Sequence, residues 1–160
     1  MTTALRLVVV LAIMFALGPP VPAFAFGSSN DSSTSASSPG AEAFAKAEKK
    51  IKAEKYKDAI PLLEKALKAD PKNANALNYL GYSHRKLGHT DQALEYYQQA
   101  LVIEPKHRGA NEYLGELYLE LKLLDKAEER LSVLSTACNA CEEYVELKEK
   151  VEAYKKGQSS

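Results

Sequence analysis

Two cysteines and three histidines are the residues whose types suit redox, nucleophilic or metal chemistry. Cys138 and Cys141 form a C-x-x-C motif, which is the spacing of thiol–disulfide oxidoreductases. The same spacing can meet the Cα distance limits of a disulfide, whereas a structural zinc site needs four ligands and only two cysteines stand together here. The motif therefore predicts either a local disulfide or a redox pair.

His84, His89 and His107 do not form a catalytic pattern. Neither His89 nor His107 has a Ser, Cys or Asp partner at a motif spacing, and the sequence contains no G-x-S-x-G, H-E-x-x-H or phosphate-binding glycine motif. We expect His84 to be a packing residue on the inner side of a helix. The sequence thus predicts a protein that is not an enzyme and that has no metal or cofactor.

The composition favours one packed domain and excludes several classes of protein. The chain has 160 residues, of which 46% are hydrophobic, which is enough for a core. Its 21 Lys and Arg balance 21 Asp and Glu, so it lacks the basic surface of a nucleic-acid-binding protein. Two cysteines are too few for a scaffold held by several disulfides.

Residues 1–25 have the three parts of a cleavable signal peptide. Arg6 is the only charged side chain before Asp31, an apolar run covers residues 7–17, and the Ala-Phe-Ala of residues 23–25 suits signal peptidase. The run makes about 16 Å of helix, which is too short for a bilayer core of about 30 Å. We predict export to the periplasm, or secretion as the alternative, with no stable membrane insertion after cleavage. An uncleaved membrane anchor is the competing interpretation.

Residues 26–40 follow as a Ser-rich segment. No bulky apolar residue occurs between positions 27 and 40, so this stretch cannot bury enough surface to offset its ordering entropy. We predict a flexible linker.

The rest of the chain contains an internal repeat. From Ala41 onward, apolar residues recur three and four apart, which predicts helices alone. Four series of residues have a 34-residue period: Ala59, Ala93 and Ala127; Leu63, Tyr97 and Leu131; Ala66, Ala100 and Leu134; and Pro71, Pro105 and Asn139. The period predicts three repeats, over residues 41–73, 74–107 and 108–141.

This pattern resembles the tetratricopeptide repeat (TPR) family, whose period is the same. The first repeat is degenerate, with Lys46 and Lys50 where Leu and Tyr are expected, as befits a terminal capping repeat. The resemblance implies a small exported bacterial protein with an all-α solenoid of helical hairpins, three repeats plus a C-terminal capping helix. The later repeats carry the family's marked residues: Leu77, Leu80, Gly81, Gly88, Ala93, Tyr97, Ala100 and Pro105, then Leu114, Gly115, Tyr118, Ala127 and Leu131.

Residues 142–160 are expected to form the capping helix and a tail. Tyr144, Leu147 and Val151 make one apolar stripe, which should cover the exposed end of the third repeat. Asn139 with Glu142 three residues later has the pattern of an N-cap with a capping box, so we expect the helix to run from about residue 140 to 156.

The resemblance also implies where a ligand binds, because the first helix of each TPR pair lines a concave groove. The Asn side chains there could bind an extended peptide backbone, the Tyr ring offers a flat surface, and the Arg could hold a carboxylate. The family's carboxylate clamp is absent, since its Lys, Asn and Arg positions carry Phe44, Glu48, Tyr79, Gly109 and Tyr113. The expected groove residues are Asn75, Asn78, Tyr82, Arg85, Glu112 and Glu116.

We therefore predict an exported, non-enzymatic adaptor or scaffold that binds a protein or peptide partner in this groove. Two alternatives stay open. One is a thiol–disulfide redox helper that uses Cys138 and Cys141, and the other is a self-associating structural module that forms homo-oligomers.

Overall fold

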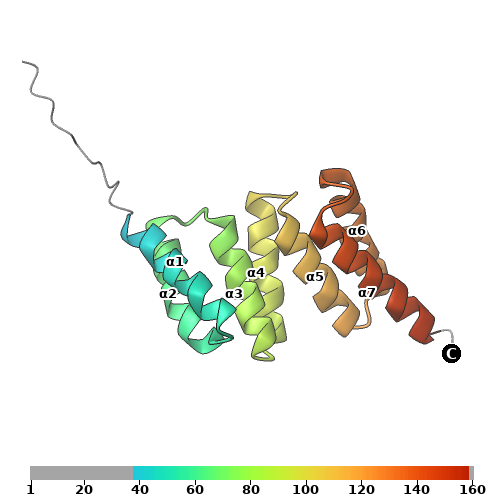
Figure 1. Cartoon of the computed structure of the whole chain (residues 1–160), viewed down its shortest axis with the longest axis horizontal. Helices are drawn as coiled ribbons and strands as arrows, with labels where there is room; N and C mark the ends of the chain where they lie inside the picture. Colours follow the sequence, from blue (N-terminus) through green and yellow to red (C-terminus); the bar gives the residue numbers. More distant parts are fainter. Residues whose placement is uncertain (1–37, 159–160) are drawn as a thin grey trace, which may run out of the picture. The chain divides into compact units, whose positions relative to one another are not determined.

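Residues 38–158, which the computed structural model of this chain describes, form seven α-helices and no strand (Figure 1). The predicted all-α fold is confirmed, and the predicted signal peptide lies outside the described residues. No helix between residues 38 and 158 is long and apolar enough to cross a membrane. The helices are α1 (Pro39–Lys52), α2 (Tyr56–Ala69), α3 (Ala74–Lys86), α4 (Thr90–Ile103), α5 (Arg108–Glu120), α6 (Leu124–Ala137) and α7 (Glu142–Gln158).

The helix boundaries follow the repeat period of the sequence. Helices α3, α5 and α7 begin at residues 74, 108 and 142, and α2, α4 and α6 begin at residues 56, 90 and 124. Consecutive helices pair as the hairpins α1–α2, α3–α4 and α5–α6, and α7 packs on both α5 and α6. By its starting position and its contacts, α7 is the first helix of a fourth unit.

Small residues bring neighbouring helices together. Ala93 is fully buried where α4 meets its neighbours. A Cβ on Gly81 would lie 2.6 Å from the ring of Tyr97, and a Cβ on Gly115 would lie 2.5 Å from Leu147. Because carbon atoms do not pack this closely, a larger residue at either glycine would force Tyr97 or Leu147 to move.

Helix α1 begins earlier than expected, so Pro39 and Gly40 are helical and do not belong to the linker. The hydroxyl of Ser38 accepts the backbone N–H of Ala41 at 3.2 Å and caps the helix. Pro39 fits the first helical position, where its missing N–H would have no partner. Gly40 is buried against α2, since a Cβ there would lie 2.5 Å from that of Ala69.

The start of α7 also differs from the prediction. The helix begins at Glu142, so Asn139 is not its N-cap. Asn139 has a left-handed φ of 54°, whereas an N-cap residue directly precedes the helix and has extended backbone. Cys141 takes that place, and its carbonyl accepts the N–H groups of Tyr144 and Val145, both at 3.1 Å.

The turn inside each repeat uses a left-handed residue at one fixed position. Glu54, Gly88 and Lys122 occupy equivalent places in successive repeats and have φ angles of 55°, 79° and 60°. Gly88 adopts this conformation without strain, because glycine has no Cβ. Glu54 and Lys122 adopt the same conformation with a Cβ, which costs about 1–2 kcal/mol.

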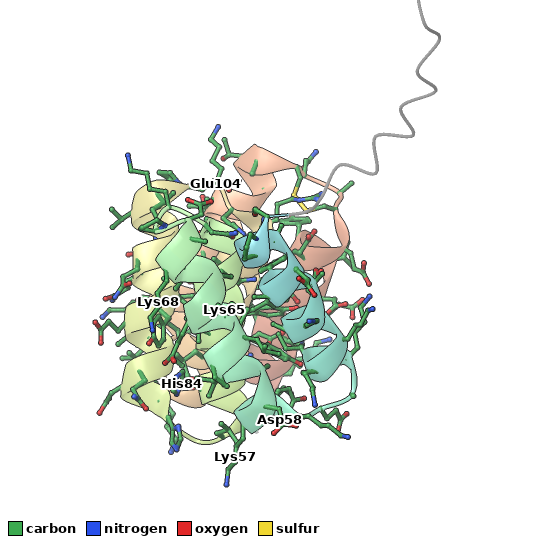
Figure 2. The ribbon with its side chains drawn as sticks, turned by 90° about the vertical axis from the view of Figure 1, so that its left-hand side faces the viewer. Lys57, Asp58, Lys65, Lys68, His84 and Glu104 are labelled. Atoms are coloured by element: carbon green, nitrogen blue, oxygen red, sulfur yellow. A yellow bond between two sulfur atoms is a disulfide. The ribbon has the colours of Figure 1, made fainter. Side chains whose placement is uncertain are left out.

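Replacing Lys122 by Gly should therefore stabilise the fold by about 0.5–1 kcal/mol, the steric relief exceeding glycine's entropy cost. Urea denaturation measures the change. The matched control is Lys65→Gly at an exposed position of α2 (Figure 2). This control should destabilise by about 1 kcal/mol, because glycine weakens a helix interior. Equal destabilisation by both changes would contradict the assigned turn geometry.

Candidate functional site

Two adjacent pockets on the first helices of the repeats form the candidate binding site. The first has a volume of about 330 Å³ and is lined by Asn75, Asn78, Tyr79, Glu104, His107, Arg108, Gly109, Glu112, Tyr113 and Glu143. The second has a volume of about 350 Å³ and is lined by Tyr82, Lys86, Glu112, Tyr113, Glu116, Glu142, Glu143, Glu146 and Lys150. We call the first the Asn78 pocket. Because three residues line both pockets, we call the two together the groove.

The groove contains five of the six site residues predicted from the sequence. Asn75 and Asn78 line the Asn78 pocket, Tyr82 and Glu116 line the second pocket, and Glu112 lines both. Arg85 lies beside the groove, in a pocket of about 420 Å³ to which Glu116 also contributes.

Aromatic rings form one wall of the groove and pack on each other from successive repeats. The ring centres of Tyr82 and Tyr113 are 4.9 Å apart, and Tyr56 meets Tyr82 edge-on at 5.8 Å. Phe44 of α1 packs against Tyr79 of α3 at 5.7 Å. These contacts hold the rings in place, so the wall is built before any ligand arrives.

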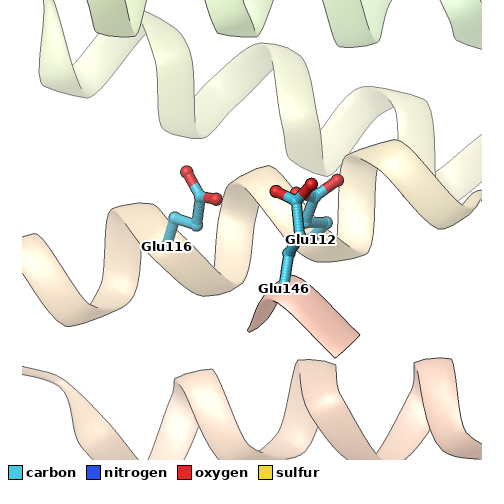
Figure 3. Close-up of side chains that lie close together, drawn as sticks. All are labelled: Glu112, Glu116 and Glu146. Carbon is cyan, nitrogen blue, oxygen red and sulfur yellow. The ribbon is translucent and has the colours of Figure 1, made fainter. Parts of the chain in front are cut away.

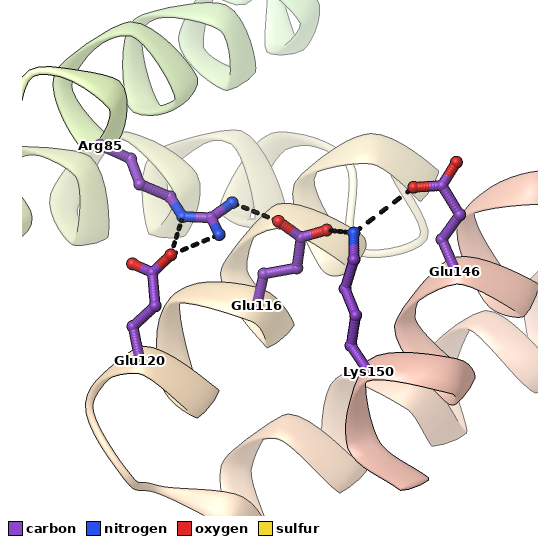
Figure 4. A network of polar contacts seen from close by, with 5 residues as sticks. All are labelled: Arg85, Glu116, Glu120, Glu146 and Lys150. Atoms are coloured by element: carbon purple, nitrogen blue, oxygen red, sulfur yellow. Dashed lines mark hydrogen bonds and ion pairs between the residues drawn. The ribbon is translucent and has the colours of Figure 1, made fainter. Parts of the chain in front are cut away.

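Arg85 binds two carboxylates of its own chain (Figure 4). Its Nη2 lies 2.6 Å from Glu120, and its Nη1 donates a hydrogen bond to Glu116. The Arg85 side chain is only 12% exposed. The role expected for Arg85, holding a partner's carboxylate, would require displacing these two partners; in this structure Arg85 instead ties α3 to α5.

Lys150 of α7 belongs to the same network, and the sequence alone did not indicate it. Its ammonium group donates to Glu116 and lies 3.4 Å from Glu146 (Figure 4). Glu116 is therefore shared between Arg85 and Lys150, and it connects three consecutive first helices. The capping helix thus supplies part of the groove.

Glu112 is almost fully buried beside two other carboxylates (Figure 3). It is 4% exposed, and one carboxylate oxygen from each of Glu112, Glu116 and Glu146 lies within 4.8 Å of the others. Burial, followed by the charges of the neighbouring carboxylates, raises the pKa of Glu112 to about 8. Such a cluster has the oxygen donors that a divalent cation prefers, although Lys150 already pairs with two of the three carboxylates.

Asn78 and His107 are the buried polar side chains at the base of the Asn78 pocket. Asn78 is 5% exposed, and its Oδ1 has no hydrogen-bond donor. His107 accepts the N–H of Ala110 on Nδ1 at 3.1 Å, so its Nε2 carries the proton and donates to Asn75 at 3.0 Å. Burial lowers the pKa of His107, which agrees with a neutral ring.

The capping role of His107 was missed because histidine is an unusual N-cap. The signal that could have revealed it is its equivalence, one repeat later, to Asn73, a typical N-cap residue that accepts the N–H of Ala76 at 2.9 Å.

The other residues with reactive side chains lie outside the groove. His84 is 7% exposed and stacks on Tyr96 with 5.3 Å between ring centres, so its expected packing role is confirmed. Cys138 and Cys141 are joined as a disulfide in the turn before α7, with their Cα atoms 5.6 Å apart.

Comparison with known families agrees with the repeat pattern. A family model described as "Anaphase-promoting complex, cyclosome, subunit 3" matches residues 52–134, which is more than half of the chain. The chain belongs to this family of TPR-type repeats. The match runs from the end of α1 into α6 of this TPR protein. No curated protein matches the sequence.

Solved structures similar to this TPR protein share its fold at low sequence identity. The first TPR domain of human RPAP3 has a TM-score of 0.67 and 18% identity, over 75% of this chain and 94% of that chain. The translocator chaperone SycD of Yersinia enterocolitica has a TM-score of 0.66 and 20% identity, over 74% of this chain and 85% of that chain. The TPR2B domain of yeast Sti1, in a complex with pHsp70, has a TM-score of 0.68 and 16% identity, over 74% of this chain and 98% of that chain.

Replacing Glu112 by Gln should remove a pH dependence of stability. The pKa of this carboxyl rises from an ordinary 4.5 to about 8 on folding, so the folded state binds more protons between these values. Stability contributed by Glu112 therefore falls as the pH rises from 4.5 to 8. Urea denaturation at several pH values should show this fall in the wild-type protein and a smaller one in the variant. Glu95→Gln, on the exposed side of α4, is the control, and equal slopes in all three proteins would contradict the assignment.

Proposed function

We propose that this chain is an exported, non-enzymatic TPR adaptor that holds an extended segment of a protein partner in the groove. The compartment we propose is the periplasm, where one setting for an adaptor is an assembly in the cell envelope. The observation that carries the proposal is that the two pockets share three lining residues and together extend over α3, α5 and α7. An extended segment lying there would meet fixed rings and side chains from the first helices of three successive units.

Similar structures support a peptide as the occupant. The first TPR domain of Spaghetti (RPAP3) is described as bound to the HSP90 peptide SRMEEVD. SycD is described in complex with a peptide of the translocator YopD. Peptide binding is thus a use of this fold in proteins whose sequences differ widely from that of this chain.

The proposal predicts that the partner contacts Tyr82. A photo-cross-linking residue in place of Tyr82 would capture the partner from a cell-envelope extract and identify the bound segment. A synthetic peptide of this segment should then bind Tyr82→Ala about 2 kcal/mol more weakly than the wild-type protein, which is a roughly 30-fold loss of affinity. Large aromatic residues dominate such interfaces. Gln98→Ala on the exposed side of α4 is the control and should bind as tightly as the wild-type protein. Circular dichroism checks that both variants keep their helices.

Binding that Tyr82→Ala leaves unchanged and Gln98→Ala abolishes would place the partner outside the groove. That result would favour an outer-surface contact or self-association.

A thiol–disulfide redox helper is the second candidate, and the bonded pair Cys138–Cys141 is the feature that favours it. Turnover of a model disulfide substrate, compared with Cys141→Ala, separates it from the adaptor. We expect no turnover, because the motif lies between helices and lacks the strand-to-helix setting of thioredoxin-like enzymes.

Export predicts the covalent state of the protein isolated from cells. The chain should begin at Phe26, and its mass should be two hydrogen atoms below that of the reduced chain, as an oxidising compartment favours the disulfide. Intact-mass spectrometry without reductant makes both measurements. A chain that keeps residues 1–25 would contradict cleavage, and a fully reduced mass would contradict the structural disulfide.

A further inference from the structure

The groove is acidic as well as aromatic. Within the described residues, its two pockets are lined by six Glu side chains and by three cationic ones, Lys86, Arg108 and Lys150. Lys150 is occupied by Glu116 and Glu146, and Arg108 lies 3.6 Å from Glu143 with more than half of its side chain exposed. The groove therefore has an excess of negative charge, which disfavours an acidic ligand.

Asn78, which lines the Asn78 pocket, has a side-chain acceptor that no group of the described chain satisfies. The Oδ1 atom of Asn78 is buried without a donor, although buried polar atoms are almost always hydrogen-bonded. The nearby nitrogen atoms of His107 are both engaged, one by Ala110 and one by Asn75. Because this oxygen is shielded from solvent, a ligand N–H meets it only when the Asn78 amide turns toward the pocket.

The other walls of the Asn78 pocket suit a cation. Glu112 and Glu143 offer carboxylate oxygens, and Tyr79 and Tyr113 offer ring faces. An ammonium or guanidinium group is attracted to both kinds of surface. The chain itself shows such a pairing next door, where Lys86 lies 5.3 Å from the ring centre of Tyr82.

From this arrangement we infer that the Asn78 pocket holds a lysine or arginine side chain of the bound segment. The cationic head donates its N–H groups to Glu112 and Glu143, and the aliphatic stem lies between Tyr79 and Tyr113. The Asn78 amide turns to present Oδ1 to the same head. This inference rests on the proposed function, since it names the residue by which a segment in the groove is recognised. A cation beside Glu112 also favours the charged form of this carboxyl, whose pKa is raised in the free protein.

A positional-scanning octapeptide library, bound to the immobilised protein, tests the inference. One position of the peptide should select Lys or Arg. Norleucine at that position should lower the affinity of a selected peptide about tenfold or more, because norleucine keeps the aliphatic stem and removes the charge. In the double variant Glu112→Gln, Glu143→Gln, the ratio between the Lys and norleucine peptides should fall to about threefold or less. Asn78→Leu should lower the affinity for the Lys peptide more than the affinity for the norleucine peptide. Glu95→Gln, which removes a charge from α4 outside the groove, should behave as the wild-type protein.

The outcomes distinguish a failure of this inference from a failure of the proposed function. Peptides that compete for the groove without selecting Lys or Arg, or that select acidic residues, overturn the inference and leave the proposed function standing. The same holds if the preference for Lys survives the double Gln variant in full. A library from which no peptide binds the groove overturns both. Thermal unfolding of each variant shows that it is folded, and the Gln variants, which keep the shape of the side chains they replace, carry the test if Asn78→Leu does not fold.

Discussion

The close approach of neighbouring helices at small residues is the constraint on which this structure depends. Gly81 and Gly115 leave room for Tyr97 and Leu147, which would otherwise collide with any Cβ at these positions. A single helical hairpin cannot bury its apolar stripe alone, so each hairpin depends on the next. The constant repeat length keeps these contacts in register along the stack, and it also fixes the turn at Gly88 and its two counterparts.

The same packing determines where the groove lies. The second helix of each hairpin packs on the first helix of its own unit and on that of the next unit, and α5 meets α3 and α7 on its remaining side. Glu116 joins these helices through Arg85 and Lys150, so ion pairs add to the ring contact between Tyr82 and Tyr113. Helix α7 therefore has two roles: it closes the core through Leu147, and it brings Lys150 and Glu146 to the groove.

Much of this arrangement could be predicted from the sequence, because the repeat period links each position to its environment. The repeat positions of Ala93 and Gly88 followed from the 34-residue period and from the resemblance to the TPR family. The positions of Asn78, Tyr82 and Glu112 in the groove followed from the same register. The period could not show that the guanidinium of Arg85 is bound by Glu116 and Glu120, since such pairs depend on side-chain directions across different helices.

Local departures from the repeat were also beyond the sequence pattern. Asn139 has the residue type of an N-cap, but its left-handed backbone leaves that place to Cys141. The burial of Glu112, which changes its protonation, arises only when α5 and α7 come together. Both cases show that a residue type restricts the local structure, whereas its surroundings decide the chemistry.

The most direct test of the groove as the binding surface is nuclear magnetic resonance of the isotope-labelled protein during titration with the captured partner segment. We predict that the largest chemical-shift changes fall on Asn78, Tyr82, Glu112 and Tyr113, with smaller ones at Glu143 and Glu146 on α7. Changes confined to the opposite side of the stack, at Gln98 and Val102 of α4, would contradict binding in the groove.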